Sequence, residues 1–255
     1  MKVICIANQK GGVAKTATSA ILASVLKQKG NRVLAIDMDP QGSLSKQVGA
    51  TTEGHEVYEG LKGNASARDA IQPLERFDIL PTSIILAGLE AELMTDVGKY
   101  FKLRDAIDEA GLKDDYDYII IDTNPGLGLV NQNAFFAADS IVLVTDVSDN
   151  GLTGVEMFQY LWGEELCTEL RIPDVTKGLV VCNYDKRIKL APEMLDYIRS
   201  REDMGGLLVD TVIPYRVAYK DTEVESKPIN LEHPKSNEHT ILEAVVKDLR
   251  KKGAI

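Results

Sequence analysis

The stretch QKGGVAKT, residues Gln9 to Thr16, follows the short apolar run Val3 to Ala7 and leads into Thr16 to Gln28, whose apolar residues recur at helical spacings. A buried strand, a glycine turn and a helix in this order favour an anion site, because unpaired N–H groups and the positive end of the helix dipole converge there. The Lys15 side chain can reach the β- and γ-phosphates of a nucleotide, and the Thr16 hydroxyl can ligate Mg²⁺. The competing interpretation is a glycine turn with a surface lysine. The K-G-G-x-x-K-T spacing between a strand and a helix disfavours it.

The alternation of strand and helix continues through the chain. Arg32 to Asp37 predicts a second buried strand, and a strand, a helix and a strand in succession favour a parallel sheet. No linker, low-complexity tract or internal repeat interrupts the pattern, so we expect one domain over residues 1–255. Its predicted class is α/β, with a doubly wound, mostly parallel sheet flanked by helices. Further predicted strands are Asp78 to Leu80, Tyr118 to Asp122, Ser140 to Thr145, Gly178 to Cys182 and Leu207 to Ile213, and further predicted helices are Ile85 to Leu93, Tyr100 to Ala110, Leu152 to Leu170, Pro192 to Arg199 and Thr240 to Lys251.

The composition excludes several classes of protein. Hydrophobic residues make up 44% of the 255 residues and charged residues 27%, the ordinary mix of a globular chain rather than a disordered one. The three cysteines, Cys5, Cys167 and Cys182, form no C-x-x-C pair, which argues against a disulfide scaffold and against zinc or iron–sulfur sites built on such pairs. No apolar stretch approaches the roughly 20 residues of a membrane span. We therefore expect a cytoplasmic protein with no membrane partner.

The charge balance limits how the chain could bind nucleic acid. Its net charge is −10, from 39 acidic and 29 basic residues. An acidic chain does not attract DNA over its whole surface. Any contact with DNA must therefore come from a local basic patch, which dimerisation could double.

Carboxylates stand at the ends of two predicted strands. The second strand ends in DMDPQG, residues Asp37 to Gly42, and Asp122 ends the strand YIIID. Taken alone, an aspartate after a strand is more often a turn or capping residue. Nucleotides, however, bind at the carboxyl ends of parallel strands, where these motifs and the glycine loop would all lie. Together the three motifs favour a nucleotide site, in which Asp122 would hold Mg²⁺ through a water molecule, as a Walker B residue does.

The loop departs from the ordinary P-loop pattern G-x-x-x-x-G-K-[ST] at Gln9 and at Ala14. It fits K-G-G-x-x-K-T, the deviant Walker A motif, in which Lys10 is an extra lysine. With the D-x-D-P-Q-G segment, this resembles the ParA/MinD group of P-loop ATPases, and the resemblance to ParA-type partition ATPases covers nearly the whole chain. The resemblance implies a P-loop NTPase fold of the deviant Walker A type, with ATP and Mg²⁺ as cofactors. The residues that it implies for nucleotide contact in the loop are Lys10, Gly11, Gly12, Val13, Ala14, Lys15, Thr16 and Ala17.

The resemblance also implies roles within the site. Lys10 would reach across a dimer interface to the partner's ATP, and Lys15 would meet the phosphates of its own subunit. Asp39, on a loop beside the γ-phosphate, can orient the attacking water, and its loss should leave ATP bound but unhydrolysed. The metal would lie near Thr16, Asp37 and Asp122, with Asp37 contacting the metal shell or stabilising the loop.

The similarity extends to the C-terminal part of the chain, where Val212 to Pro214 and Lys227 to Ile229 match segments of the family. Residues around the proline of this region border the adenine in the family, and Pro214 and Asn183 are the candidates here. Two departures stand out. Tyr215 replaces the usual arginine, and Asp146 stands where the family tends to have glutamine or glutamate.

Two basic groups are candidates for DNA contact. One comprises Lys186, Arg187 and Lys189, in which Arg187 matches an arginine of the family, and the other comprises Arg216 and Lys220. A solvated surface face is the competing interpretation of any such group. The family context favours contact with DNA.

The resemblance implies a partition ATPase for a plasmid or a chromosome. Such an ATPase forms a homodimer in the ATP state, binds DNA without sequence preference, and hydrolyses ATP when a ParB-like centromere-binding protein stimulates it. We expect it on the nucleoid of a bacterial or archaeal cell. The alternative is a ParA-like ATPase that positions a protein cargo.

A MinD-like membrane-associated ATPase is a further alternative. The final predicted helix lacks large aromatic residues, and its apolar face, residues 241, 242, 245, 246 and 249, is also what a packed helix needs. Core packing is the better interpretation. A nitrogenase-type reductase is excluded, because residues 123–139 contain no cysteine to hold its cluster.

Overall fold

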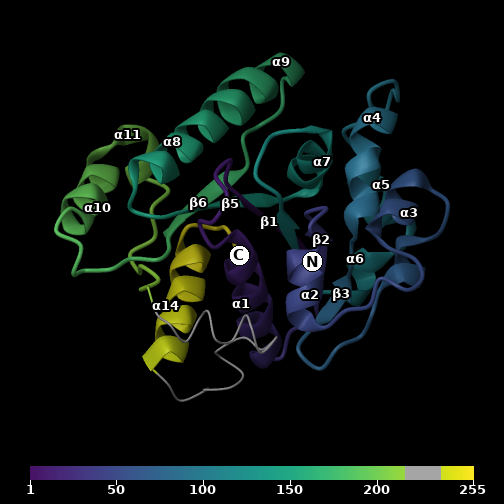
Figure 1. The fold of residues 1–255 in the computed structure, drawn as a ribbon, viewed down its shortest axis with the longest axis horizontal. Coiled ribbons are helices and arrows are strands. Elements are labelled where there is room, and N and C mark those ends of the chain that lie inside the picture. The colour runs from purple at the N-terminus through teal and green to yellow at the C-terminus, as the bar shows by residue number, and fades with distance from the viewer. Residues whose placement is uncertain (216–236) are drawn as a thin grey trace.

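The computed structural model describes residues 1–215 and 237–255, and a parallel sheet of six strands runs through its centre (Figure 1). The strand order is β3-β2-β4-β1-β5-β6, and every neighbouring pair is parallel. The predicted doubly wound α/β fold is confirmed. The strands are β1 (Lys2–Ala7), β2 (Val33–Met38), β3 (Asp78–Leu80), β4 (Tyr118–Thr123), β5 (Ser140–Thr145) and β6 (Thr176–Val181).

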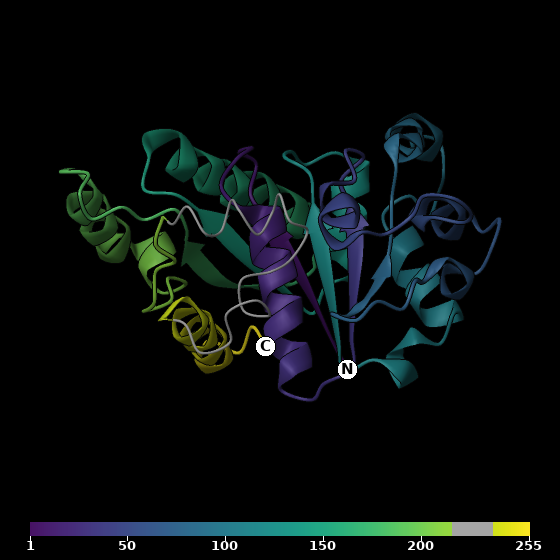
Figure 2. The same cartoon turned by 60° about the horizontal axis from the view of Figure 1, so that its bottom comes forward.

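Helices cover both faces of the sheet, because alternate side chains of each strand point to opposite faces. Figures 1 and 2 show helices on both sides of the sheet. On β1, Ile4 and Ile6 pack into one core, and Val3 and Cys5 pack into the other. The first core lies under α1 (Lys15–Gln28), α2 (Ser43–Val48) and α14 (Asn237–Lys251). The second core lies under α3 (Val57–Lys62), η1 (Ala67–Ala70), η2 (Ile84–Gly88), α4 (Leu89–Leu93), α5 (Lys102–Glu109), α6 (Leu112–Asp115), α7 (Leu129–Ala137), α8 (Asp149–Phe158), α9 (Cys167–Leu170), α10 (Ala191–Ser200) and α11 (Glu202–Gly205).

The long helix predicted over Leu152 to Leu170 is regular only at its two ends. Between α8 and α9 the chain forms a π-helical segment, η3 (Gln159–Leu166). Its Trp162 is buried, donates from Nε1 to Asp174 at 3.1 Å, and lies edge-on to Phe135 with ring centroids 5.3 Å apart. The π-helical segment therefore contributes the largest side chain of this core.

The strand predicted over Leu207 to Ile213 is wrong. The segment lies beside β6 and makes an isolated bridge between Leu208 and Leu179, but it forms no strand. The N–H and hydroxyl of Thr211 donate instead to the Asp248 carboxylate on α14, at 3.0 and 2.7 Å. The Thr211 N–H thus bonds a side chain instead of a backbone carbonyl of a neighbouring strand. The regular strand pairing of the sheet therefore ends at β6.

The final helix α14 uses its apolar stripe inside the molecule. Leu242, Val245, Val246 and Leu249 are buried, and they pack in the same core as α1. Core packing, the preferred interpretation of this helix, is confirmed. Among the helices of the described residues, none has the length and apolarity to cross a membrane.

Phe135→Ala tests the aromatic core under α7 and α8. Phe135 is 1% exposed between Phe158 and Trp162, so its truncation should leave a cavity and lower the free energy of unfolding by about 3–5 kcal/mol. Urea unfolding followed by circular dichroism measures the change. Tyr160→Ala, at a side chain that is 52% exposed, is the control and should change stability much less. Equal effects of the two substitutions would contradict this packing.

Candidate functional site

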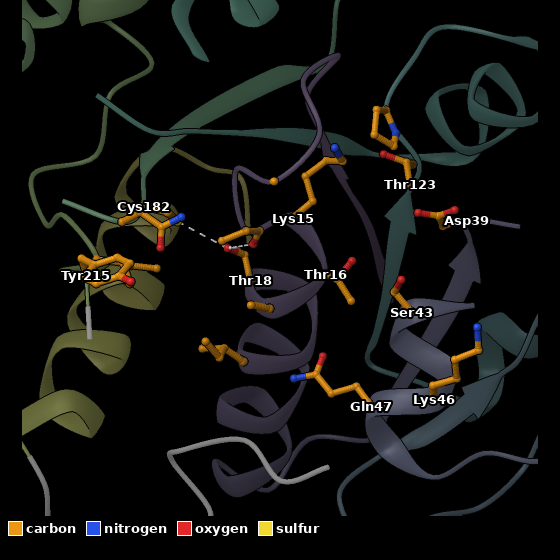
Figure 3. Close-up of a pocket in the computed structure, with 17 residues that line it drawn as sticks. Lys15, Thr16, Thr18, Asp39, Ser43, Lys46, Gln47, Thr123, Cys182 and Tyr215 are labelled. Atoms are coloured by element: carbon orange, nitrogen blue, oxygen red, sulfur yellow. Dashed lines mark hydrogen bonds between the residues drawn. The ribbon is translucent and has the colours of Figure 1, made fainter. Parts of the chain in front are cut away.

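The carboxyl ends of β1, β2, β4 and β6 surround a cavity of about 670 Å³. The start of α1 lines it with Lys15 and Thr16, and Asp39 and Thr123 follow β2 and end β4 (Figure 3). On the far side of α1 from Asp39, the cavity reaches Tyr215 (Figure 3). The sheet thus joins the phosphate loop, the carboxylate motifs and the candidate adenine region in one site.

The backbone of the loop makes room for an anion at the start of α1. Gly12 has φ 79°, and Ala14, the residue before the helix, has φ 71° and ψ 31°. Both lie in the left-handed region, which glycine adopts freely and alanine adopts at a cost of about 1 kcal/mol. No side chain caps the α1 N-terminus. Its orphan N–H groups and the helix dipole are therefore available to a phosphate.

The predicted loop residues divide into those that line the cavity and those that support it. Gly12, Ala14, Lys15, Thr16 and Ala17 line it. The others do not: Val13 is fully buried in the core beneath the loop, Gly11 lies against Pro125, and the Lys10 side chain points to α8.

Lys15 is a buried cation, with only 6% of the residue exposed. Its Nζ donates to the Lys10 carbonyl at 2.9 Å, within the loop. Burial lowers the pKa of Lys15, and the negative charges of Asp122 and Asp39 act in the opposite direction. The ammonium is therefore held where anionic groups compensate its lost hydration.

Asp37 and Asp122 are fully buried register partners on the neighbouring strands β2 and β4. Burial raises the pKa of each carboxyl, and the charge of Asp37 adds to the rise at Asp122. The Ser19 hydroxyl donates to Oδ1 of Asp122 at 2.7 Å, whereas Oδ2 of Asp122 has no hydrogen-bond partner within residues 1–215 and 237–255. A buried carboxylate oxygen without a donor is what a hydrated Mg²⁺ ion would satisfy, so Asp122 fits a metal site.

Asp37 is engaged with its own loop. Its Oδ2 accepts from the N–H and the hydroxyl of Ser45 at 2.8 and 2.7 Å, and its Oδ1 accepts from the Asp39 N–H at 3.1 Å. Of its two predicted roles, the contacts favour stabilising the loop. Asp39 itself accepts from the Gln41 N–H at 2.9 Å and faces the cavity, with Thr123 nearby (Figure 3).

Lys10 lies outside the cavity of its own subunit. Its Nζ contacts the Asp146 carboxylate at 3.1 and 3.3 Å and the Ser148 hydroxyl at 2.9 Å. The Lys10 N–H donates to Oδ1 of Asn8 at 2.8 Å. The two lysines of the motif thus point to different places, Lys15 into the site and Lys10 toward the start of α8.

The candidate adenine residues lie at the other end of the cavity. Asn183 lines it with φ 54°, whereas Pro214 pairs with Tyr184, and only the neighbours of Pro214, Ile213 and Tyr215, line the cavity. In the sequence, Tyr215 stands out only because it replaces the arginine that is usual in the family. Its aromatic ring at the cavity wall is a feature that the replacement of arginine by tyrosine could have signalled.

The basic group after β6 is on the surface. Lys186, Arg187 and Lys189 are exposed. The Arg187 guanidinium donates to both oxygens of the Asp185 carboxylate, with the closest contact at 2.7 Å. The pKa of Arg187 is raised by this hydrogen bond. Arg216 and Lys220 lie outside the described residues.

Several polar residues that support the site were not predicted. They are Asn8, Ser19, Ser45 and Ser148, each of which bonds a loop or carboxylate of the site. Nothing in the local sequence marks Asn8 or Ser19 through Val144 and Asp122, which lie 136 and 103 residues away. Ser45 and Ser148 follow the aspartates that they bond by eight and two residues, a spacing that could have signalled them.

The glycine loop at the N-terminus of α1 and Asp39 after β2 line one cavity, and the buried Asp122 at the end of β4 lies beside Lys15 of the loop. This arrangement defines a P-loop nucleotide-binding protein. The model of a family described as an AAA domain matches residues 1–163. The chain is 34% identical over 259 residues to the sporulation initiation inhibitor protein Soj of Bacillus subtilis, covering 99% of both chains. It is 32% identical over 240 residues to the chromosome partitioning protein ParA of Myxococcus xanthus, covering 92% of this chain and 83% of that one. The chain belongs to this AAA-domain family and, within it, to the ParA/Soj-type ATPases.

A solved structure extends the likeness. It is described as cobyrinic acid a,c-diamide synthase of Mycobacterium smegmatis with bound ATP analogue and magnesium. It is similar with a TM-score of 0.78 and 29% identity over 92% of this chain and 96% of that one.

Asp122→Asn tests the buried carboxylate pair. A folded-state pKa above the ordinary value means that the ionised carboxylate destabilises the fold, and this cost grows as the pH rises above about 4. Neutral asparagine should therefore raise the free energy of unfolding at pH 8, by about 1 kcal/mol or more, and by less at pH 5. Urea unfolding in metal-free buffer at the two pH values measures it.

The control carries the opposite sign. Hydrogen bonds from Arg32 lower the pKa of Asp117 to about 2, so its ionised form stabilises the fold above its ordinary pKa. Asp117→Asn should lower stability at pH 8. A loss of stability at pH 8 in Asp122→Asn would contradict the conclusion that burial and the charge of Asp37 make the ionised Asp122 carboxylate unfavourable.

Proposed function

We propose that this protein is a ParA-type ATPase for plasmid or chromosome partition, acting as one domain over residues 1–255. It binds ATP with Mg²⁺, forms a homodimer in that state, binds DNA without sequence preference, and hydrolyses ATP faster when a ParB-like centromere-binding protein engages it. It works in the cytoplasm, on the nucleoid. The observation that carries the proposal is that Lys15 and Asp39 line one cavity at the start of α1, with the buried Asp122 carboxylate close enough to act on the charge of Lys15. The ParA name of the M. xanthus relative supports partition.

The residues present fit ATP and Mg²⁺. The uncapped α1 N-terminus and Lys15 suit a phosphate chain, and the unpartnered Oδ2 of Asp122 with the Thr16 hydroxyl suits a hydrated metal. When bound, ATP supplies the phosphoryl group, and Mg²⁺ neutralises its developing charge. The M. smegmatis structure, described with both an ATP analogue and magnesium, supports these cofactors.

The chain's own residues divide the chemistry by charge. The Lys15 side chain lies at the start of α1, and its ammonium can offset the charge of a bound phosphate. Asp39 lines the cavity, and its carboxylate, whose Oδ1 accepts from the Gln41 N–H, can accept a further hydrogen bond from the attacking water. Asp37 keeps the Asp39 loop in place through the Asp39 N–H.

The position of Lys10 supports a role between subunits. Its side chain does not line the cavity of its own subunit, and 27% of the side chain is exposed beside α8. A second subunit facing this edge could receive the ammonium at its own phosphates. The proposed active unit is therefore a homodimer.

The DNA surface is proposed from the loop after β6. Lys186, Arg187 and Lys189 supply positive charge on a chain of net charge −10, and a dimer would carry two copies. Contacts with phosphates carry no sequence information, so binding should be indifferent to sequence. Arg216 and Lys220, outside the described residues, are also proposed to contact DNA.

The alternative of a ParA-like ATPase that positions a protein cargo uses the same nucleotide cycle. The site is the same in both cases, and the cargo distinguishes them. A MinD-like membrane role is disfavoured, because the apolar stripe of α14 is buried in the core.

Asp39→Ala separates binding from hydrolysis. The variant should bind ATP normally and accumulate as a dimer, because only the water-orienting group is lost, while turnover falls by two or more orders of magnitude. Titration calorimetry, sizing with ATP and Mg²⁺, and phosphate release measure the three properties. Lys15→Ala is the contrasting variant and should abolish ATP binding. Normal ATP affinity in Lys15→Ala would overturn the proposed site.

Arg187→Ala tests the DNA surface. In the presence of a non-hydrolysable ATP analogue, the variant should bind two unrelated duplexes equally and more weakly than wild type, with the slope of log K against log salt smaller by about 1 for each copy lost. Gel shift across a salt series measures it. Arg199→Ala, which removes another ion-paired surface arginine, is the matched control. An unchanged salt slope in Arg187→Ala would place the DNA surface elsewhere.

A further inference from the structure

Lys10 sits in a cradle formed by Asp146 and Ser148, between the end of β5 and the start of α8. The contacts of its Nζ are 3.1 Å to Oδ2 and 3.3 Å to Oδ1 of Asp146 and 2.9 Å to Oγ of Ser148. A lysine ammonium has three N–H donors and no acceptor. The cradle therefore gives the ammonium an ion pair with one carboxylate and a hydrogen bond to one hydroxyl, all within its own subunit.

The cradle is itself fixed. Oγ of Ser148 donates to Oδ1 of Asp146 at 2.5 Å and accepts from the Gly151 N–H at 3.1 Å, which makes Ser148 the cap of α8. At the other side, Asn8 donates from Nδ2 to the Val144 carbonyl at 2.7 Å and accepts from the Lys10 N–H. Both the lysine and its acceptors are thus anchored to β1 and β5, neighbouring strands of the sheet.

Helix α8 can approach so closely only because two of its residues have no side chain. A Cβ at Gly151 would lie 2.2 Å from Oδ1 of Asp146, and a Cβ at Gly154 would lie 2.3 Å from Oδ1 of Asn8 and 3.2 Å from Cβ of Lys10. Real Cβ atoms do not approach polar atoms so closely. The two glycines, three residues apart on one helix face, seat α8 against the loop that carries Lys10.

We propose that Asp146, with Ser148, is the positioning residue for Lys10, and that it holds the lysine in its own subunit against transfer to the partner's nucleotide. This rests on the proposed function, because it needs the ATP-dependent dimer. An ammonium paired with the Asp146 carboxylate must give up that ion pair before it can contact a phosphate of the partner subunit. The ion pair therefore stabilises the subunit with its lysine unengaged, and it sets how much ATP-state dimer forms at a given protein concentration.

Asp146→Asn is the central variant. It keeps the shape of the side chain and removes its charge. With a non-hydrolysable ATP analogue and Mg²⁺, sedimentation velocity should show the dimer forming at a protein concentration about threefold to fivefold lower than for wild type, the range expected for a partly exposed ion pair. In the Lys10→Ala background, the same substitution should have no effect on dimerisation, since there is then no ammonium to hold.

The matched control is Asp149→Asn. Asp149 lies three residues further along, in the first turn of α8, and the structure gives its side chain no contact with Lys10. This substitution removes the same charge from the same region. It should leave the dimer equilibrium within about twofold of wild type, so a general effect of lowering negative charge can be told apart from release of the lysine.

A second measurement reports the cradle without any dimer. Trace acetylation of the nucleotide-free protein with acetic anhydride, followed by peptide mass spectrometry, measures the reactivity of Lys10 against that of Lys186. Lys10 should become several-fold more reactive in Asp146→Asn and stay unchanged in Asp149→Asn.

The outcomes separate this proposal from the proposed function. Increased Lys10 reactivity with tighter dimerisation supports the proposal. Unchanged reactivity, or an unchanged dimer equilibrium in Asp146→Asn while wild type dimerises, overturns it and leaves the proposed function standing. Weaker dimerisation in Asp146→Asn also overturns it, and would mean that Asp146 presents the lysine to the partner. Failure of wild type and variant alike to dimerise with the analogue overturns both proposals.

Discussion

Asp37 and Asp122 occupy matched positions on the neighbouring strands β2 and β4, so the parallel sheet itself brings two buried carboxylates together. Charges of one sign in such a place repel each other and lose their hydration, which is unfavourable unless donors or a cation stand beside them. The fold supplies both. Helix α2 gives Asp37 two donors from Ser45, and helix α1 places Ser19 and the Lys15 ammonium near Asp122. The starts of α1 and α2 are therefore fixed by the same electrostatic requirement that the register of β2 and β4 creates.

Serine hydroxyls recur at this edge in a consistent way. Ser19 bonds Asp122, Ser45 bonds Asp37, and Ser148 bonds Asp146, at 2.7, 2.7 and 2.5 Å. A hydroxyl satisfies one lone pair of a carboxylate and leaves its negative charge in place, unlike a lysine or an arginine. The three aspartates at the ends of β2, β4 and β5 are thus held in position while they remain able to attract cations. Asp146 attracts one already, in Lys10.

The sequence predicted those parts of the fold and site that depend on local pattern. Apolar runs such as Tyr118 to Asp122 became strands, and the glycine loop fell at the start of α1 because Gly12 and the residue before Lys15 both take left-handed backbone there. The pattern failed where a distant side chain intervened. The segment Leu207 to Ile213 has the apolar content of a strand. The Thr211 N–H, however, donates to Asp248 on the last helix instead of to a neighbouring strand.

Contacts between distant residues explain why the surroundings of Lys10 were not predicted. The motif spacing locates the lysine, yet its acceptors Asp146 and Ser148 follow the neighbouring strand β5, 136 and 138 residues further along the chain. Their approach depends on Gly154, a residue that looks like a weakness in a helix, because glycine in a helix interior costs about 1 kcal/mol relative to alanine. That cost is understandable only from the folded molecule, where a Cβ would overlap Asn8. Gly154 therefore lowers the intrinsic stability of helix α8 and allows the helix to lie against the phosphate loop. The position of Lys10 is set by this packing, which no short motif encodes.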